Sequence, residues 1–541
     1  MKRFIKSFVV TALAFSLVGC GSKNSGDTAS DNILTVAKEN DVISLNSMYA
    51  TDGMSFEVIH AAVDGLMTQD AQGNIIEAIA KSYEVSDDGL VYTFKLRDDA
   101  KWTNGTPVTA NDFEFAWKFA VASPDAEYSY LFTKDGASIA GADEIVFASE
   151  GEKVDADTLG IKAIDDTTLE VKLSQATPYF LSLMTFPVFY PVNEEFYNEQ
   201  GEDYAITPDN FMANGAFVLD SWERGAKIEL SKNEDYYDAE NVKIDGLVFQ
   251  ITPEVSTSVT AFEGGTVDFT KLSSTLVDKY KDSKEYSSIL DGYLWYFQTN
   301  LRNEIMANKN FRLALAHAVD YDELVNGVLK DGSVKGKGFA PEGLATGPDG
   351  KDFRETAGDY YDTDTTKAQE YFDKALKELG KDSISIELLY ENADPAKSAA
   401  EYLKSNLEQT LEGLTIEMNM QSKESRLDLQ RAFDFELILT RWGPDYADPT
   451  TYLNLMLDGN AYNYGGYTSE AYDGLLDKAA TAATPEARWD ALIEAEKQLM
   501  NDLPAIPLFQ VGGASLIAEG VSGIENHAVG VPYIYKNAEI K

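Results

Sequence analysis

Two hydrophobic periodicities occur in the same 541-residue chain, and together they restrict it to the mixed α/β class. Apolar and polar residues alternate, as they do in strands with one buried face, over residues 90–97, 169–173 and 228–230. Apolar residues three and four positions apart predict helices over residues 311–319, 368–379 and 489–500. Thr484 and Pro485 are suited to cap and begin the last of these. Strand patterns dominate the first half and helical patterns the stretch from 300 to 505, so we expect several lobes.

The composition is that of an ordinary globular protein, with 44% hydrophobic and 25% charged residues. It argues against a disordered chain and against a multi-pass membrane protein. At about 150 residues per domain, the length corresponds to roughly three to four domains, or to fewer if they are interwoven. The net charge of −45 repels phosphate groups, so no nucleic-acid partner is expected. A Gly/Pro-rich stretch at 331–350 predicts a long surface loop.

The first 20 residues have the pattern of an export signal. A basic start is followed by an apolar stretch at 8–18, which is too short to span a bilayer. The sequence Leu-Val-Gly-Cys that ends at Cys20 resembles a bacterial lipobox, in which the signal is cut before the cysteine and the thiol carries a diacylglycerol. The alternative is an ordinary secretory signal with an incidental cysteine. Residues 21–32 are rich in Gly, Ser, Asn and Asp and predict a flexible tether. We therefore expect an extracytoplasmic protein anchored to the cell membrane through Cys20.

Catalytic and metal-binding motifs are missing from the sequence. Cys20 is the single cysteine, so no intrachain disulfide and no cysteine-based metal site can form. The three histidines (His60, His317 and His527) lie far apart, and no His-Glu-x-x-His motif occurs. There is neither a phosphate-binding loop nor a Gly-x-Ser-x-Gly nucleophile motif. With 90 carboxylates, adjacent acidic pairs are expected on solvated turns. We therefore predict a non-enzymatic protein with no metal and no cofactor.

Five segments, spread in order along the chain, resemble the bacterial extracellular solute-binding proteins of family 5. The resemblance is to their oligopeptide-binding lipoproteins, the capture subunits of peptide ABC importers. The most distinctive segment reads Trp-Gly-Pro-Asp-Tyr-Ala-Asp-Pro-Thr at 442–450. The other segments are 88–118, 160–180, 214–217 together with 233–237, and 311–320. The resemblance extends over nearly all of residues 33–541.

The resemblance implies an α/β fold: a two-lobed, periplasmic-binding-protein-like clamp of the class II type, with an extra third domain. Its implied divisions are residues 33–64, 190–298 and 510–541 for lobe I, 65–189 for the extra domain and 299–509 for lobe II. The chain would cross between the lobes more than once. A ligand would be held in the cleft between them.

The resemblance also implies a function. The expected protein is the lipid-anchored binding subunit of an ABC importer, which captures an oligopeptide and delivers it to the permease. ATP hydrolysis would belong to partner ATPase subunits, because this chain has no nucleotide motif. We expect it to act as a monomer. Two alternatives stay open: a dipeptide, metal-chelate or haem receptor on the same fold, and a signalling receptor for a peptide pheromone. A secreted hydrolase is disfavoured by the missing motifs.

A clamp that accepts many peptides must hold what all peptides share, which is the backbone and the α-ammonium group. The backbone can be bound as an added strand. A buried ammonium needs a carboxylate, because an unpaired charge in a closed site is costly. By resemblance that carboxylate is Asp445; alternatively, Asp445 is only a turn residue after Pro444. Trp442 would line a side-chain pocket, although a core position is almost as well supported.

The backbone of Arg441 and Gly443 would pair with the ligand, and Thr51, Asp52 and Gly53 match the opposite pairing segment on lobe I. Glycine permits the close approach of another backbone, but both glycines are equally consistent with simple turns.

Two positions depart from well-known relatives, which hold the carboxylate of a short peptide with an arginine and a histidine. Leu439 and Ala396 occupy those positions here. We therefore hypothesise that this protein does not select peptide length through that clamp, and that it favours longer peptides or a different ligand.

Overall fold

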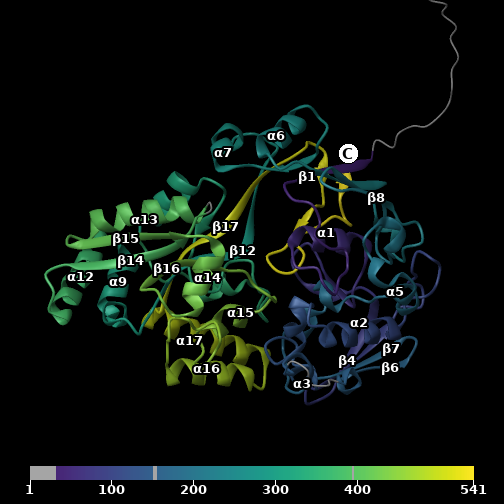
Figure 1. Ribbon diagram of the computed structural model, residues 1–541, viewed down its shortest axis with the longest axis horizontal. Coiled ribbons are helices and arrows are strands. Elements are labelled where there is room, and N and C mark those ends of the chain that lie inside the picture. Colours follow the sequence, from purple (N-terminus) through teal and green to yellow (C-terminus); the bar gives the residue numbers. More distant parts are fainter. Residues whose placement is uncertain (1–31, 150–154, 393–394) are drawn as a thin grey trace, which may run out of the picture.

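The structure is a computed structural model that describes residues 32–149, 155–392 and 395–541 (Figure 1). The predicted export signal, Cys20 and nearly all of the predicted tether lie outside the described residues. Within the described part the chain folds into two bodies that are joined by a pair of long strands, β12 (Tyr286–Thr299) and β17 (Ala505–Ile517).

One large sheet runs through both bodies. Among the described residues it has eleven strands in the order β15-β14-β16-β12-β17-β11-β1-β10-β9-β8, and β13 (Val334–Lys335) pairs with β17 off this path. The strands on the β12 side are β16 (Leu437–Trp442), β14 (Ile384–Glu391) and β15 (Leu414–Gln421). Those on the β17 side are β11 (Phe269–Lys271), β1 (Ile33–Lys38), β10 (Gly246–Ile251), β9 (Lys227–Lys232) and β8 (Phe217–Glu223).

Strands β12 and β17 are antiparallel and pair along most of their length. Leu290 lies opposite Gly512 and Leu294 opposite Gln510, with an irregularity between the two pairs. This irregular stretch holds residues 291–293, within the pair of strands that joins the two bodies (Figure 1). A β-bulge bends a strand and aims side chains away from the regular pleat, so the crossing is suited to form the floor of a cleft.

Each body has its own apolar core. One core is built from β12, β14, β16, β17 and the helices of residues 305–500. The other joins residues 34–249 to residues 531–538 near the end of the chain. A four-stranded sheet packs within this second body, in the order β4 (Ala80–Val85), β5 (Val91–Leu96), β7 (Thr168–Lys172) and β6 (Ile161–Asp165). Because one core spans both sides of positions 64 and 189, the boundaries of the extra domain stay a prediction.

Helices cover the sheets of both bodies (Figure 1). In the body that contains β1 they are α1 (Gly53–Ala62), α2 (Ala110–Ala122), α5 (Glu194–Gln200), α6 (Val255–Glu263) and α7 (Ser274–Tyr280). In the other body they are α9 (Lys309–Ala318), α12 (Thr365–Leu379), α13 (Ala396–Thr410), α14 (Lys423–Arg431), α16 (Glu470–Ala480) and α17 (Pro485–Asp502). Shorter helices include α3 (Ala142–Val146), α4 (Phe180–Leu183), α8 (Glu304–Ala307), α11 (Phe353–Ala357) and α15 (Thr450–Leu453).

The strands and helices predicted from periodicity are confirmed. The alternation at 90–97 corresponds to β5, and the helical spacing at 368–379 corresponds to α12. Thr484 caps α17, accepting a hydrogen bond from the Ala487 N–H at 3.2 Å, and Pro485 is the first helical residue. These elements were predictable because their signals are local.

The prediction of a surface loop at 331–350 is wrong for its central part. Phe339 and Ala340 are fully buried in the core of the second half of the chain. Gly338 packs against a buried ion pair between Arg354 and Glu496, and a Cβ at this position would come within 1.7 Å of Arg354 Nη1. The glycines of this stretch therefore allow close packing as well as turns.

Candidate ligand-binding cleft

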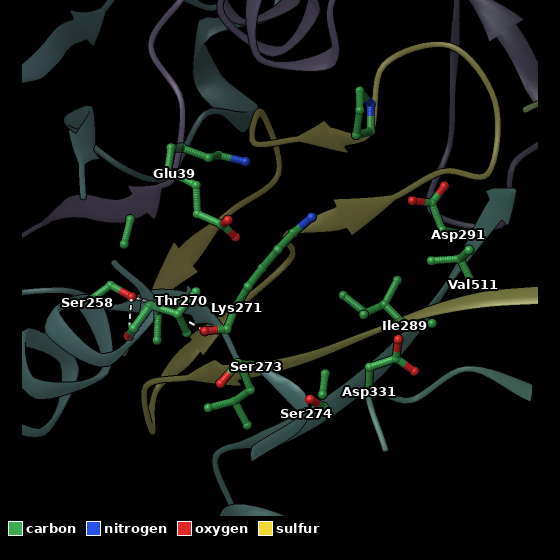
Figure 2. A pocket seen from close by; sticks show the side chains of 18 of the residues that line it. Glu39, Ser258, Thr270, Lys271, Ser273, Ser274, Ile289, Asp291, Asp331 and Val511 are labelled. Atoms are coloured by element: carbon green, nitrogen blue, oxygen red, sulfur yellow. Dashed lines mark hydrogen bonds between the residues drawn. The ribbon is translucent and has the colours of Figure 1, made fainter. Parts of the chain in front are cut away.

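A cavity of about 660 Å³ lies where β12 and β17 cross between the two bodies (Figure 2). Its floor is formed by Ile289 and Asp291 of β12 and residues 511–514 of β17. One wall comes from residues 37–40, 53–57, 252–274 and 526–533, and the other from residues 328–331 and 395–398. Both bodies thus contribute to one concave site, and its volume is in the range of sites for small organic ligands.

Asp445 lies three residues after β16, on a turn whose backbone is held by a hydrogen bond from its N–H to the Thr451 hydroxyl at 3.0 Å. Burial raises the pKa of the Asp445 carboxyl to about 6, and a hydrogen bond from the Tyr130 hydroxyl partly opposes this. No basic side chain of the described residues acts on it. The Asp445 carboxyl group is therefore desolvated without a cationic partner among the described residues, and its predicted contact with a ligand stays a prediction.

Tyrosines surround this carboxyl group. Burial and the charge of Asp445 raise the pKa of Tyr128 and Tyr130, which lie on a short 3-10 helix at Glu127–Phe132, and that of Tyr462. Tyr293 lies two residues after Asp291 in the irregular part of β12, and the charge of Asp445 contributes to its raised pKa after the larger effect of burial. Sequence reasoning missed these residues; the only signal was the aromatic pair in Glu-Tyr-Ser-Tyr at 127–130, which is far from Asp445 in sequence.

Trp442 packs against the core of its body and against a tyrosine, and its predicted contact with a ligand stays a prediction. It is half-buried against the core of its body, and its ring packs edge-on against Tyr462 with centroids 4.8 Å apart. Its indole Nε1 is buried and has no hydrogen-bond partner among the described residues. The ring therefore lies at the rim of the tyrosine cluster, by which we mean Tyr128, Tyr130, Tyr293 and Tyr462.

The backbone of Arg441 and Trp442 has one unpaired edge. On one side β16 pairs with β12, where Arg441 lies opposite Trp295 and Trp442 opposite Leu294. On the other side β14 pairs with β16 only at Leu437 and Ile438, within the residues the structure describes. An unpaired edge of this kind can accept an extended peptide as an added strand.

Close contacts with neighbouring side chains explain why glycine occupies positions 443 and 53. A Cβ on Gly443 would come within 2.4 Å of the Tyr293 ring, so a neighbouring side chain already requires glycine there. Gly53 begins α1 and lines the cavity; a Cβ there would come within 3.0 Å of Pro532.

Asp52 caps α1, accepting a hydrogen bond from the Ser55 N–H at 2.9 Å, so its carboxylate has a structural role. The charges of Asp445 and Asp52 both contribute to the raised pKa of Tyr128, after the larger effect of burial. The charges of Asp52 in one body and Asp445 in the other thus act on the same tyrosine. Their predicted contacts with a ligand stay predictions.

Comparison with known proteins decides the family. The family model for bacterial extracellular solute-binding proteins, family 5, matches residues 74–464, well over half of the chain. The chain belongs to this family. A dipeptide-binding protein of Lactococcus lactis is 34% identical over 99% of this chain and 98% of its own length. The resemblance stated from the motifs is confirmed, as are the α/β clamp fold and the non-enzymatic role, since members of the family bind solutes.

Solved structures of related proteins have the same fold. Peptide-bound OppA of Listeria monocytogenes is 33% identical, and the match covers 95% of this chain and 100% of that one with a TM-score of 0.73. The unliganded open form of the murein tripeptide-binding protein MppA is 25% identical, over 95% and 98% of the two chains, with a TM-score of 0.81. Both matches extend over nearly the whole chain, so the fold is shared along its full length and is not limited to one body.

Neither a membrane-spanning helix nor a metal-binding cluster occurs in the described part of the chain. None of its helices combines the length and the apolar character needed to cross a bilayer. In the same residues, no cluster of three or more His, Cys, Asp or Glu side chains is arranged to hold a metal ion.

Proposed function

We propose that the protein captures oligopeptides between its two bodies and delivers them to the permease of an ABC importer. The observation that carries this proposal is the Asp445 carboxyl group, which is desolvated and has no basic partner among the described residues. A buried carboxylate of this kind is completed by a cation that the ligand brings. The α-ammonium group of a peptide is such a cation, and the peptide backbone can pair with the free edge of β16. The names of the Lactococcus and Listeria relatives support a peptide as the ligand.

The remaining predicted site residues fit around this anchor. The backbone of Arg441 and Gly443 would pair with the peptide on one side, and the segment from Thr51 to Gly53 on the other. Trp442 would contact a ligand side chain, because its ring lies at the rim of the tyrosine cluster.

The predicted cellular setting is part of the same proposal. A lipid on Cys20 would hold the protein at the outer face of the cell membrane, and residues 21–32 would act as the tether. The protein would work as a monomer, and a permease with its ATPase subunits would receive the peptide. Residues 33–64, 190–298 and 510–541 would move as lobe I, with the extra domain at 65–189, against lobe II at 299–509.

Mass spectrometry of ligand released from the purified protein tests this function. The secreted chain is purified from cells grown in peptide-rich medium, unfolded, and its small-molecule fraction is sequenced. We expect a mixture of peptides with different sequences, present in the wild type and in Asp209→Ala, which removes an exposed carboxylate, but depleted in Asp445→Ala. A haem or metal chelate in place of peptides would contradict the proposal. A single peptide of one sequence would instead support the pheromone receptor.

A further inference from the structure

Two lysines face the same aromatic ring in the wall of the cleft. The Nζ atom of Lys38, at the end of β1, lies 4.6 Å from the centroid of the Tyr533 ring, and that of Lys271, at the end of β11, lies 5.8 Å from it. The charge of Lys271 contributes to the lowered pKa of Lys38, although burial is the larger cause. The two ammonium groups are therefore close enough to repel each other.

Only one of these two ammonium groups has a carboxylate partner. Lys38 forms an ion pair with Glu57 at 2.5 Å, and both side chains are almost fully buried. The same Glu57 oxygen, Oε2, accepts a hydrogen bond from the Tyr535 hydroxyl at 2.7 Å. Lys271 is exposed, and no carboxylate of the described residues lies within ion-pair distance of it. Figure 2 shows its side chain extended toward the middle of the cavity.

The acidic groups that share the cavity have other surroundings. Asp291 is the one close enough for Lys271 to act on its pKa, but burial dominates and raises that pKa, which weakens Asp291 as a counterion. Asp331 accepts a hydrogen bond from the Ser333 N–H at 2.9 Å, and Glu39 lies in the exposed part of the wall. Within the part of the chain that the structure describes, the ammonium group of Lys271 thus lines the cavity without a carboxylate at ion-pair distance, in a protein whose net charge is −45.

We propose that Lys271, in the wall of the cavity, binds a carboxylate of the ligand whose amine Asp445 would hold. This inference rests on the proposed peptide-binding function and adds a second anchor to it. It also addresses the loss of the family's usual anchors, since Leu439 is buried in the core and Ala396 is fully buried. The carboxylate would come from the C-terminus of the peptide or from an acidic side chain near it.

The register of the sheet gives the approximate distance between the two anchors. Lys271 lies opposite Ser515 on β17, and Trp442 is connected through Leu294 to Gln510 on the same strand. Three strand spacings of about 4.8 Å and five residues of about 3.3 Å separate Trp442 from Lys271, which corresponds to roughly 20 Å across the sheet. From Leu437 to Trp442, β16 runs in the direction that leads from Gln510 to Ser515 on β17, and Asp445 follows Trp442 by three residues. An extended peptide of about four to six residues fits this span.

Calorimetry with a peptide series tests the second anchor. Peptides of two to seven residues are prepared as free acids, as C-terminal amides, and as amides that carry a penultimate aspartate. They are titrated into the wild type, Lys271→Gln, Lys271→Arg and the control Lys284→Gln, which removes an exposed lysine of the same body outside the cavity. For peptides of four to six residues we expect amidation to weaken wild-type and Lys284→Gln binding about tenfold or more.

In Lys271→Gln the free acid should bind about as weakly as the amide, while Lys271→Arg should keep most of the difference. Recovery of affinity by the aspartate in the amide series would identify a side-chain carboxylate as the source. An amidation effect of equal size in the wild type and in Lys271→Gln would overturn the inference but leave the peptide-binding function intact. Failure of every peptide to bind the wild type would overturn the proposed function itself.

Discussion

Replacing Asp445 by Asn should stabilise the unliganded protein and, at the same time, abolish tight peptide binding. Burial raises the pKa of this carboxyl group from its ordinary value of 3.8 to about 6. A raised pKa means that the folded state holds the proton more tightly than the unfolded chain does. The folded state therefore loses stability as the pH rises from about 4 to about 6, and above pH 6 the whole loss is present.

The size of this loss follows from the shift. About two pKa units at 1.36 kcal/mol each correspond to roughly 3 kcal/mol, an upper limit because the side chain is still partly exposed. Asparagine has the same shape without the charge, and its carbonyl oxygen can still accept the hydrogen bond from Tyr130. We therefore expect Asp445→Asn to raise the free energy of unfolding by about 1–3 kcal/mol at pH 7.5. At pH 4, where the native carboxyl group is protonated, the variant should gain almost nothing.

Urea unfolding at the two pH values measures this difference directly. The control is Asp209→Asn, because Asp209 is exposed and any loss of negative charge relieves general repulsion in a chain of net charge −45. Calorimetry then measures binding of a pentapeptide, which should weaken by about 2–5 kcal/mol in Asp445→Asn, since a buried ammonium group loses its counterion. N-acetylation of the peptide should weaken binding to the wild type and have little further effect in the variant.

Three outcomes would refute this reasoning. A gain in stability that is the same at pH 4 and pH 7.5, or no larger than that of Asp209→Asn, would mean that the Asp445 carboxylate is not destabilised by burial. Unchanged peptide affinity in Asp445→Asn would mean that the ammonium group binds elsewhere. Equal loss on N-acetylation in both proteins would lead to the same conclusion.

Three further predictions follow from other parts of the structure. Peptide affinity of the wild type should fall about tenfold between pH 7 and pH 5, because Asp445 with a pKa of about 6 must lose its proton before it can pair with an ammonium group. Titrations in buffers of different ionisation enthalpy should detect the released proton near pH 5. Affinity that does not depend on pH would contradict this prediction. Glu57→Gln should destabilise the protein by about 3–5 kcal/mol in urea unfolding, because it leaves the buried Lys38 without a counterion, whereas Glu39→Gln, at an exposed position, should have little effect. Gly338→Ala should strongly reduce the melting temperature, because the new Cβ would overlap Arg354. The control Gly474→Ala, where nothing lies within 4 Å of the new Cβ, should leave the melting temperature nearly unchanged. Equal melting temperatures for the two variants would show that Arg354 does not lie close to Gly338.

The elements of the fold were predictable where the signal lay within one element. The strand β5 and the helices α12 and α17 each carry a complete periodicity, and Thr484 and Pro485 mark the beginning of α17 within two residues. The stretch at 331–350 was interpreted wrongly because its burial depends on contacts with distant residues. Glu496, for example, forms the ion pair beside Gly338 and lies more than 150 residues further along the chain. No local pattern distinguishes a glycine that packs against such a pair from a glycine in an exposed turn.

The candidate site likewise contains residues that a local motif identifies and residues that only distant contacts bring together. Asp445 and Trp442 were identified because one short segment, Trp-Gly-Pro-Asp-Tyr, contains both and resembles the family motif. The chemistry around Asp445 could not be predicted, because Tyr130 lies on the other body and more than 300 residues away in sequence. Lys271 has no motif at all. What singles it out is that Glu57 is already paired with Lys38, a fact that only the three-dimensional arrangement reveals.

The two proposed anchors together predict that a ligand favours closure of the cleft. Asp445 follows β16 in one body, and Lys271 ends β11 in the other, so each body presents a charge that has no partner of its own among the described residues. Closing the empty cleft would bury the exposed Lys271 ammonium group in addition to the already desolvated Asp445 carboxyl group, at a cost of several kcal/mol, because desolvation outweighs a distant attraction. A zwitterionic peptide supplies a counterion to each end, and it can pair with both only when the bodies come together. The ligand thus has a much higher affinity for the closed state than for the open one, which is the condition for a ligand to shift such an equilibrium. On this argument a peptide that lacks either terminal charge would bind to one body and leave the clamp largely open.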